Sequence, residues 1–189
     1  MRKGLFAGIA ALAMFAAPAS AGARAQTHEP AAAKQSSTDQ TFVKKAAEGG
    51  MAEVELGKLA ADKGASSEVK QFGQKMVDDH GKANDQLKSL ARTKNITLPS
   101  DLSPKDKALH DRLSKLSGAA FDRAYMKAMV SDHTKDVNEF RAQSKSGVDP
   151  DIKSWASSTL PTLESHLKMA QDANRAVGTS GTLPKNPKK

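Results

Sequence analysis

The strongest constraint on the fold is an apolar side chain every three or four residues, repeated along nearly all of residues 39–177. Four segments carry this spacing: about 39–63, 67–93, 119–145 and 149–177. In the first of them the stripe reads Phe42, Ala46, Gly49, Glu53, Leu56, Ala60. This period places side chains on one face of an α-helix, and no strand-like alternation accompanies it. We therefore expect an all-α fold in which four long helices form a bundle.

Start and stop signals fall where the periodic segments end. Ser37 or Thr38 is expected to cap the first helix, and Gly64 and Gly147 follow the first and third. Between the second and third helices, Ser103 followed by Pro104 is typical of a helix start. A short connector helix over about 103–116 is therefore predicted there.

One ionisable residue interrupts each apolar stripe near its middle. These residues are Glu53, His80, His133 and His166. Counting residues from the turns near 65 and 147, at about 1.5 Å per residue, puts the first two about 4–5 Å apart in height and the last two about 7–8 Å apart. We expect the four side chains to converge in the centre of the bundle.

A short motif, Met-Val-x-Asp-His, occurs twice, at residues 76–80 and 129–133. It puts Asp79 and Asp132 one step round the helix from an inward histidine. Asp136 follows His133 by one turn. A carboxylate in such a position can accept the second ring N–H of a neighbouring histidine, so we predict that these three act as accessory residues.

Buried ionisable groups need partners, because burying them unpaired costs several kcal/mol each. Three imidazoles and a carboxylate suit zinc, copper or iron. A metal-free network of shared protons would also satisfy them. Helical spacing does not choose between these alternatives.

The first 25 residues have the pattern of a secretory signal peptide. Arg2 and Lys3 precede a short apolar run, and small residues allow cleavage after Ala21 or Ala25. No later stretch is apolar enough to span a bilayer. We expect an exported protein, with a flexible leader over 26–38 and a disordered basic tail over 178–189.

The composition limits the kinds of cross-link, metal site and binding partner that the protein can have. The sequence has no cysteine, which excludes disulfides and thiolate metal sites. Its net charge of +8 would allow acidic envelope polymers as partners, but the lysines are spread among Asp and Glu along the helices, which indicates a solvated surface of mixed charge. Aromatic residues make up only 4%, which is too few for base-stacking surfaces, so we expect no nucleic acid.

Several longer motifs resemble the DUF 4142 family of exported bacterial proteins, also described as predicted outer-membrane proteins. They are "TFVKKAAEGGMAEVELGKLA", "FGQKMVDDH", "LSGAAFDRAYMKAMVSDHTKDV" and "TLPTLESHLKMA". The resemblance covers about residues 39–177 and implies a ferritin-like bundle, export, and a location in the periplasm or at the outer-membrane periphery. It implies no activity. The chain departs from the di-iron pattern of ferritin-like proteins, because it has no Glu-x-x-His and few inward carboxylates.

Three functional hypotheses follow. The leading one is a non-enzymatic envelope or stress-related protein that binds a metal through Glu53, His80, His133 and His166. The second is a metal-dependent oxidoreductase that uses the same site. The third is a metal-free interaction module whose core histidines are structural.

Overall fold

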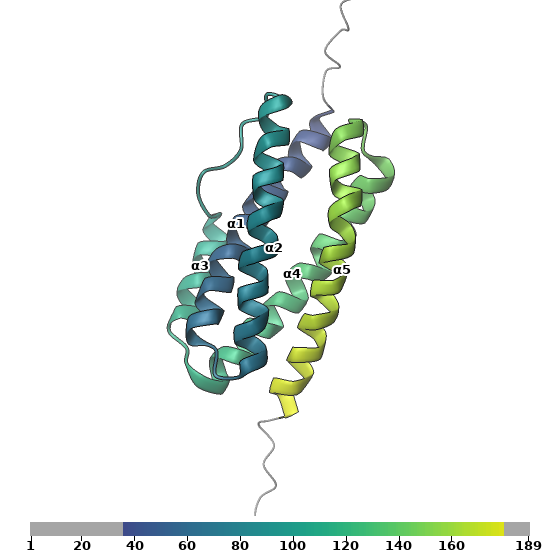
Figure 1. Cartoon of the computed structure of the whole chain (residues 1–189). Coiled ribbons are helices and arrows are strands. Elements are labelled where there is room, and N and C mark those ends of the chain that lie inside the picture. Colours follow the sequence, from purple (N-terminus) through teal and green to yellow (C-terminus); the bar gives the residue numbers. More distant parts are fainter. Residues whose placement is uncertain (1–35, 180–189) are drawn as a thin grey trace, which may run out of the picture. The chain divides into compact units, whose positions relative to one another are not determined.

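The computed structural model describes residues 36–179, and within them it contains five α-helices and no strand (Figure 1). The helices are α1 (Ser37–Lys63), α2 (Ser67–Thr93), α3 (Pro104–Ser114), α4 (Gly118–Ser146) and α5 (Pro150–Thr179). This confirms the all-α class, with four long helices and one short connector. The predicted signal peptide, residues 26–35 of the leader and residues 180–189 of the tail lie outside the described residues. None of the five helices is long and apolar enough to cross a membrane.

Helix starts follow local capping chemistry. The side-chain oxygens of Ser66 and Ser103 accept backbone N–H groups at the starts of α2 and α3. Asp149 accepts the N–H groups of Asp151 and Ile152 at the start of α5. The cap of α1 is Ser36, so this helix begins two residues before the predicted position. Frayed first turns make shifts of this size common.

The bundle consists of two helical hairpins (Figure 1). α1 pairs with α2, and α4 pairs with α5. The hairpins meet where α1 contacts α4 and α2 contacts α5, while α3 packs on both α1 and α4. Because α1 has neighbours on several sides, its buried face is wider than the predicted stripe. Val43, Ala47 and Gly50 are buried, whereas Ala46 and Gly49 are only partly covered.

The turn within each hairpin is held by an aspartate from the other hairpin. Asp122, on α4, accepts the N–H groups of Ala65 and Ser66 in the α1–α2 turn, at 2.9 and 2.8 Å. Asp39, on α1, accepts the N–H of Asp149 in the α4–α5 turn at 2.8 Å. Both carboxylates are buried. These bonds fix how far one hairpin can slide along the other, and so keep the residues at the centre in register.

The first hairpin depends on Gly57 of α1 and Gly73 of α2, which let the two helices approach closely. We expect Gly73→Ala to lower the free energy of unfolding by about 1–3 kcal/mol. A Cβ at Gly73 would lie 2.7 Å from the carbonyl oxygen of Gly57 and 2.8 Å from the backbone nitrogen of Ala61, which is too close for either to remain in place.

Gly81→Ala is the matched control in the same helix. No atom lies within 4 Å of a Cβ at Gly81, so the alanine is expected to stabilise α2 by up to about 1 kcal/mol. Urea unfolding of both variants measures the difference. Equal effects of the two substitutions would contradict the close approach of α1 and α2.

Candidate metal centre

A layer of ionisable side chains divides the apolar core into two halves. Leu56, Met76 and Met129 belong to one apolar cluster, and Phe42 and Leu87 belong to the other. Between the halves each long helix contributes one buried ionisable residue: Glu53 from α1, His80 from α2, His133 from α4, and His166 from α5. This is the layer that the interrupted stripes predict, and the structure places all four residues inside the bundle.

The three histidines form a compact triangle. Their ring centroids are 5.7 Å apart for His80 and His133, 5.3 Å for His80 and His166, and 5.5 Å for His133 and His166. One nitrogen from each ring lies within 4.8 Å of the other two. The exposed fractions are 6% for His80, 0% for His133 and 1% for His166. A small ion between the rings would therefore be shielded from bulk water.

Hydrogen bonds fix the tautomers of two of these rings. Nδ1–H of His133 donates to the carbonyl oxygen of Met129 at 3.0 Å, because that oxygen can only accept. Nε2–H of His166 donates to Oδ2 of Asp79 at 2.9 Å. The opposite nitrogens, Nε2 of His133 and Nδ1 of His166, are left with free lone pairs. These two atoms and Nε2 of His80 are buried without a hydrogen-bond partner.

All three rings are held neutral. Burial, followed by the neighbouring His133 and His166, lowers the pKa of His80 to about 3. Burial and the nearby His166 lower the pKa of His133 to about 4, against the opposing effect of its bond to Met129. Burial also lowers the pKa of His166, although Asp79 opposes it. Neutral imidazoles have the lone pair that a metal ion requires.

Glu53 lies on the other side of His133. Its Oε1 is 3.6 Å from Nδ1 of His133, the nitrogen that faces Met129, and its Oε2 is buried without a partner. The group whose ligand atoms lie close together comprises the three histidines. Burial, and then the negative charges of Asp136, Asp132 and Asp106, raise the pKa of Glu53 well above its usual value.

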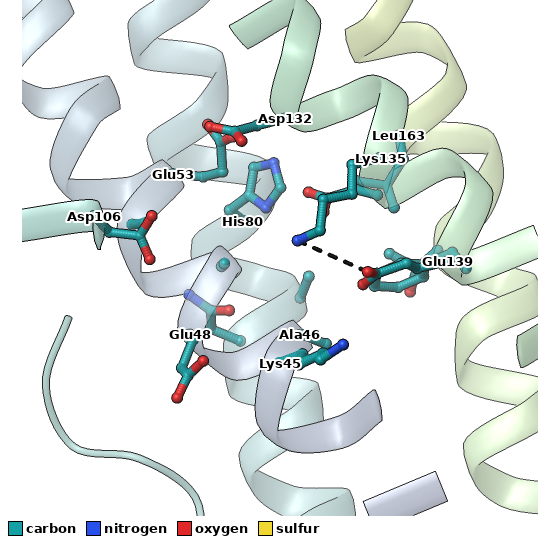
Figure 2. Close-up of a pocket in the computed structure, with 18 of the residues that line it drawn as sticks. Lys45, Ala46, Glu48, Glu53, His80, Asp106, Asp132, Lys135, Glu139 and Leu163 are labelled. Atoms are coloured by element: carbon teal, nitrogen blue, oxygen red, sulfur yellow. Dashed lines mark ion pairs between the residues drawn. The ribbon is translucent and has the colours of Figure 1, made fainter. Parts of the chain in front are cut away.

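The three accessory aspartates have different surroundings. Asp79 contacts His166 and also pairs with Lys75 at 2.9 Å. Asp132 lies 3.6 Å from Lys105 of α3. Asp136 is partly buried, and together with Asp132 and Glu53 it lines a cavity of about 220 Å³. His80 forms part of the same wall, and Figure 2 shows Glu53, His80 and Asp132 at one end of this cavity.

Sequence reasoning missed two residues around this layer. The Tyr125 hydroxyl is buried without a hydrogen-bond partner, and burial together with the nearby Glu53 raises the pKa of this phenol. Asp106, in the first turn of α3, lines the cavity. Neither residue interrupts a long apolar stripe, so helical spacing gave no signal for them.

The geometry fits a metal ion with a small closing movement. Metal–imidazole bonds are about 2.0–2.1 Å long, which places two ligand nitrogens of a tetrahedral site about 3.3–3.4 Å apart. Nitrogens up to 4.8 Å apart must therefore approach by about 1–1.5 Å, within the reach of rotation about the side-chain bonds. Asp79 and the Met129 carbonyl bind the opposite nitrogens, as the outer partners of metal-bound histidines do.

Fold and site together define a class: an all-α bundle with a layer of buried histidines across its core. The chain belongs to the family described as "Domain of unknown function (DUF4142)", whose model matches residues 24–173. Among solved structures, it is similar to a DUF305 fragment from Deinococcus radiodurans, with a TM-score of 0.66 and 12% sequence identity. The alignment covers 77% of this chain and 98% of that one, and shows a shared fold. The search of curated proteins finds no match.

Proposed function

We propose that this protein is an exported envelope protein that binds one transition-metal ion between His80, His133 and His166. The observation that carries the proposal is twofold: one nitrogen of each ring lies within 4.8 Å of one on each of the other two, and each ring has a buried nitrogen without a hydrogen-bond partner. Buried polar atoms of native proteins nearly always have a partner. A metal ion would supply one to all three atoms at once.

The chemistry of the three ligands limits which metal ion can bind. Three imidazoles suit zinc, copper or iron, and the chain offers no thiolate that would favour a soft ion. Glu53 lies near the nitrogen of His133 that is bonded to the Met129 carbonyl, so the proposed ligands are the three imidazoles, and water would complete the coordination of the ion. A protein that holds a metal ion for envelope maintenance or stress protection needs only a site that binds the ion.

Export rests on the pattern of residues 1–25, which supports a location in the periplasm or at the outer-membrane periphery. An imported metal ion meets this compartment before the cytoplasm. A buried histidine site is therefore well placed to take up such an ion. Recovery of the protein in the cytoplasm with residues 1–25 still attached would contradict this part of the proposal.

Elemental analysis of untagged protein from a periplasmic extract tests the site. We expect about one metal ion per chain in the wild type and none in the double variant His80→Ala/His133→Ala. His110→Ala is the matched control, because His110 lies on α3, outside the triangle, and is partly exposed. This control is expected to keep its metal.

Asp79→Asn distinguishes a loss of metal caused by the altered site from a loss caused by misfolding. It keeps all three ligands and removes only the carboxylate that orients His166, so metal affinity is expected to fall by about 10–100-fold. Far-UV circular dichroism checks that each variant is folded. Equal metal content in the wild type and the double variant, or none in the wild type after loading with zinc, copper and iron, would overturn the proposal.

A further inference from the structure

The cavity beside the histidine triangle is acidic, although the chain as a whole has a net charge of +8. The side chains around it include twice as many carboxylates as amines. The carboxylates belong to Glu48, Glu53, Asp106, Asp132, Asp136 and Glu139, and the amines belong to Lys45, Lys105 and Lys135. An excess of negative charge around a partly enclosed space attracts cations and concentrates them there.

The lysines do not neutralise the inner end of the cavity. Lys135 reaches Glu139 at 3.7 Å, and Lys105, which is mostly exposed, reaches Asp132 at 3.6 Å. Within residues 36–179, no lysine or arginine nitrogen lies within 4 Å of a carboxylate oxygen of Glu53 or Asp136. No lysine or arginine therefore pairs directly with these two carboxylates, although the more distant Lys135 and Lys105 lower the pKa of Asp136.

Glu53 gives the independent sign of a ligand. The residue is only 3% exposed and lines the cavity, and its Oε2 is buried with no hydrogen-bond partner. Asp132 and Asp136 are four residues apart on α4, so both lie on the face of that helix that borders the cavity. Figure 2 shows Glu53 and Asp132 at the same end of the cavity, beside His80.

We propose that this cavity is a second cation site, in which Glu53, Asp132 and Asp136 bind a divalent cation that prefers oxygen ligands. Carboxylates from two helices and water are the ligands that magnesium, calcium and manganese ions take in proteins. A cavity of about 220 Å³ has room for the ion and several waters, each of which occupies about 30 Å³ in the liquid. This site is distinct from the histidine triangle and does not need that site to be filled.

Manganese(II) is a suitable probe, because the electron paramagnetic resonance signal of the free ion disappears when it binds. Protein is first loaded with one equivalent of zinc per chain, so that the histidine triangle is filled without excess zinc, and is then titrated with manganese chloride. We expect one manganese ion to bind per chain. Asp136→Asn is expected to weaken this binding at least tenfold, whereas Asp85→Asn, on the exposed surface of α2, is expected to leave it unchanged.

The histidine variant separates the two sites. His166→Ala is expected to lose zinc and to keep manganese binding. Loss of both metals in that variant would mean a single site, and the second site would be excluded. Equal manganese binding by wild type and Asp136→Asn, or none by the zinc-loaded wild type, would overturn the second site while leaving the histidine site to its own test by elemental analysis.

Discussion

Asp136→Asn is expected to raise the free energy of unfolding at pH 8 by about 2 kcal/mol in metal-free protein, and to leave it unchanged at pH 3. The physical cause is the cost of holding a charged carboxylate beside other carboxylates in a partly buried position. Burial is the main influence and raises the pKa of Asp136 from its usual 3.8 to about 7. The charged groups around it act in both directions; they are Asp132 and Glu139, which raise the pKa, and Lys135 and Lys105, which lower it.

The direction of the pH dependence follows from proton binding. Below pH 3.8 the Asp136 carboxyl is protonated in both the folded and the unfolded chain, so Asp136→Asn does not change the free energy of unfolding. Between pH 3.8 and about 7 the unfolded chain loses this proton first, and the wild type loses stability as the pH rises. Above pH 7 the Asp136 carboxylate is charged in both states, and the folded wild type carries the full free-energy cost of holding this charge. A shift of one pKa unit corresponds to about 1.4 kcal/mol, and we expect less than the full value because water reaches part of the side chain.

Chemical unfolding of chelator-treated wild type and variant, from pH 3 to pH 8, measures this gain. Asp85→Asn is the control, because its carboxylate is 80% exposed and its substitution is expected to change stability by less than about 0.5 kcal/mol at any pH. A gain from Asp136→Asn that is as large at pH 3 as at pH 8 would show that packing rather than charge causes it.

A more stable Asp136→Asn variant would also clarify the manganese experiment. If the variant is folded and more stable than the wild type, its weaker manganese binding cannot come from unfolding. The wild-type chain would then carry a carboxylate that lowers its own stability at neutral pH. Binding groups often have this property, because they are arranged for a ligand rather than for the empty fold.

The sequence predicted the histidine layer well because the spacing along a helix is regular. Once Glu53, His80, His133 and His166 are seen to interrupt apolar stripes, a rise of 1.5 Å per residue and two short turns are enough to place them at similar heights. The structure places all four within the core and brings the three rings together. Local geometry and chain connectivity determine this result, and both can be read from the residues.

The contacts between the two hairpins could not be predicted from the sequence. Asp79 and Asp132 occupy equivalent places in the repeated Met-Val-x-Asp-His motif, yet Asp79 bonds His166 whereas Asp132 lies near Lys105. The rotation of each helix and the position of α3 decide this difference, and neither has a period in the sequence. For the same reason spacing could not show that Glu53 faces Nδ1 of His133 rather than its free nitrogen.

Asp39 is the clearest case of a residue whose role comes only from tertiary structure. It lies in the first turn of α1, where an acidic residue usually serves the helix N-terminus from the surface. Here it is only 1% exposed. Its carboxylate accepts the side-chain amide of Gln143 at 2.6 Å, the N–H of Asp149 at 2.8 Å and the N–H of Val148 at 3.3 Å.

Asp39→Ala is expected to lower the free energy of unfolding by about 3–5 kcal/mol. Each buried donor that loses its acceptor costs about 1–3 kcal/mol, and three donors lose the same carboxylate. Asp39→Asn keeps one acceptor oxygen of nearly the same shape, so its loss is expected to be smaller. Thermal and urea unfolding measure both variants against Asp85→Ala, whose side chain is mostly in water. If Asp39→Ala costs no more than Asp85→Ala, the α4–α5 turn does not depend on this carboxylate. A large loss in Asp39→Ala would instead show that the register between the hairpins, and with it the alignment of the histidine layer, is fixed at the end of the bundle.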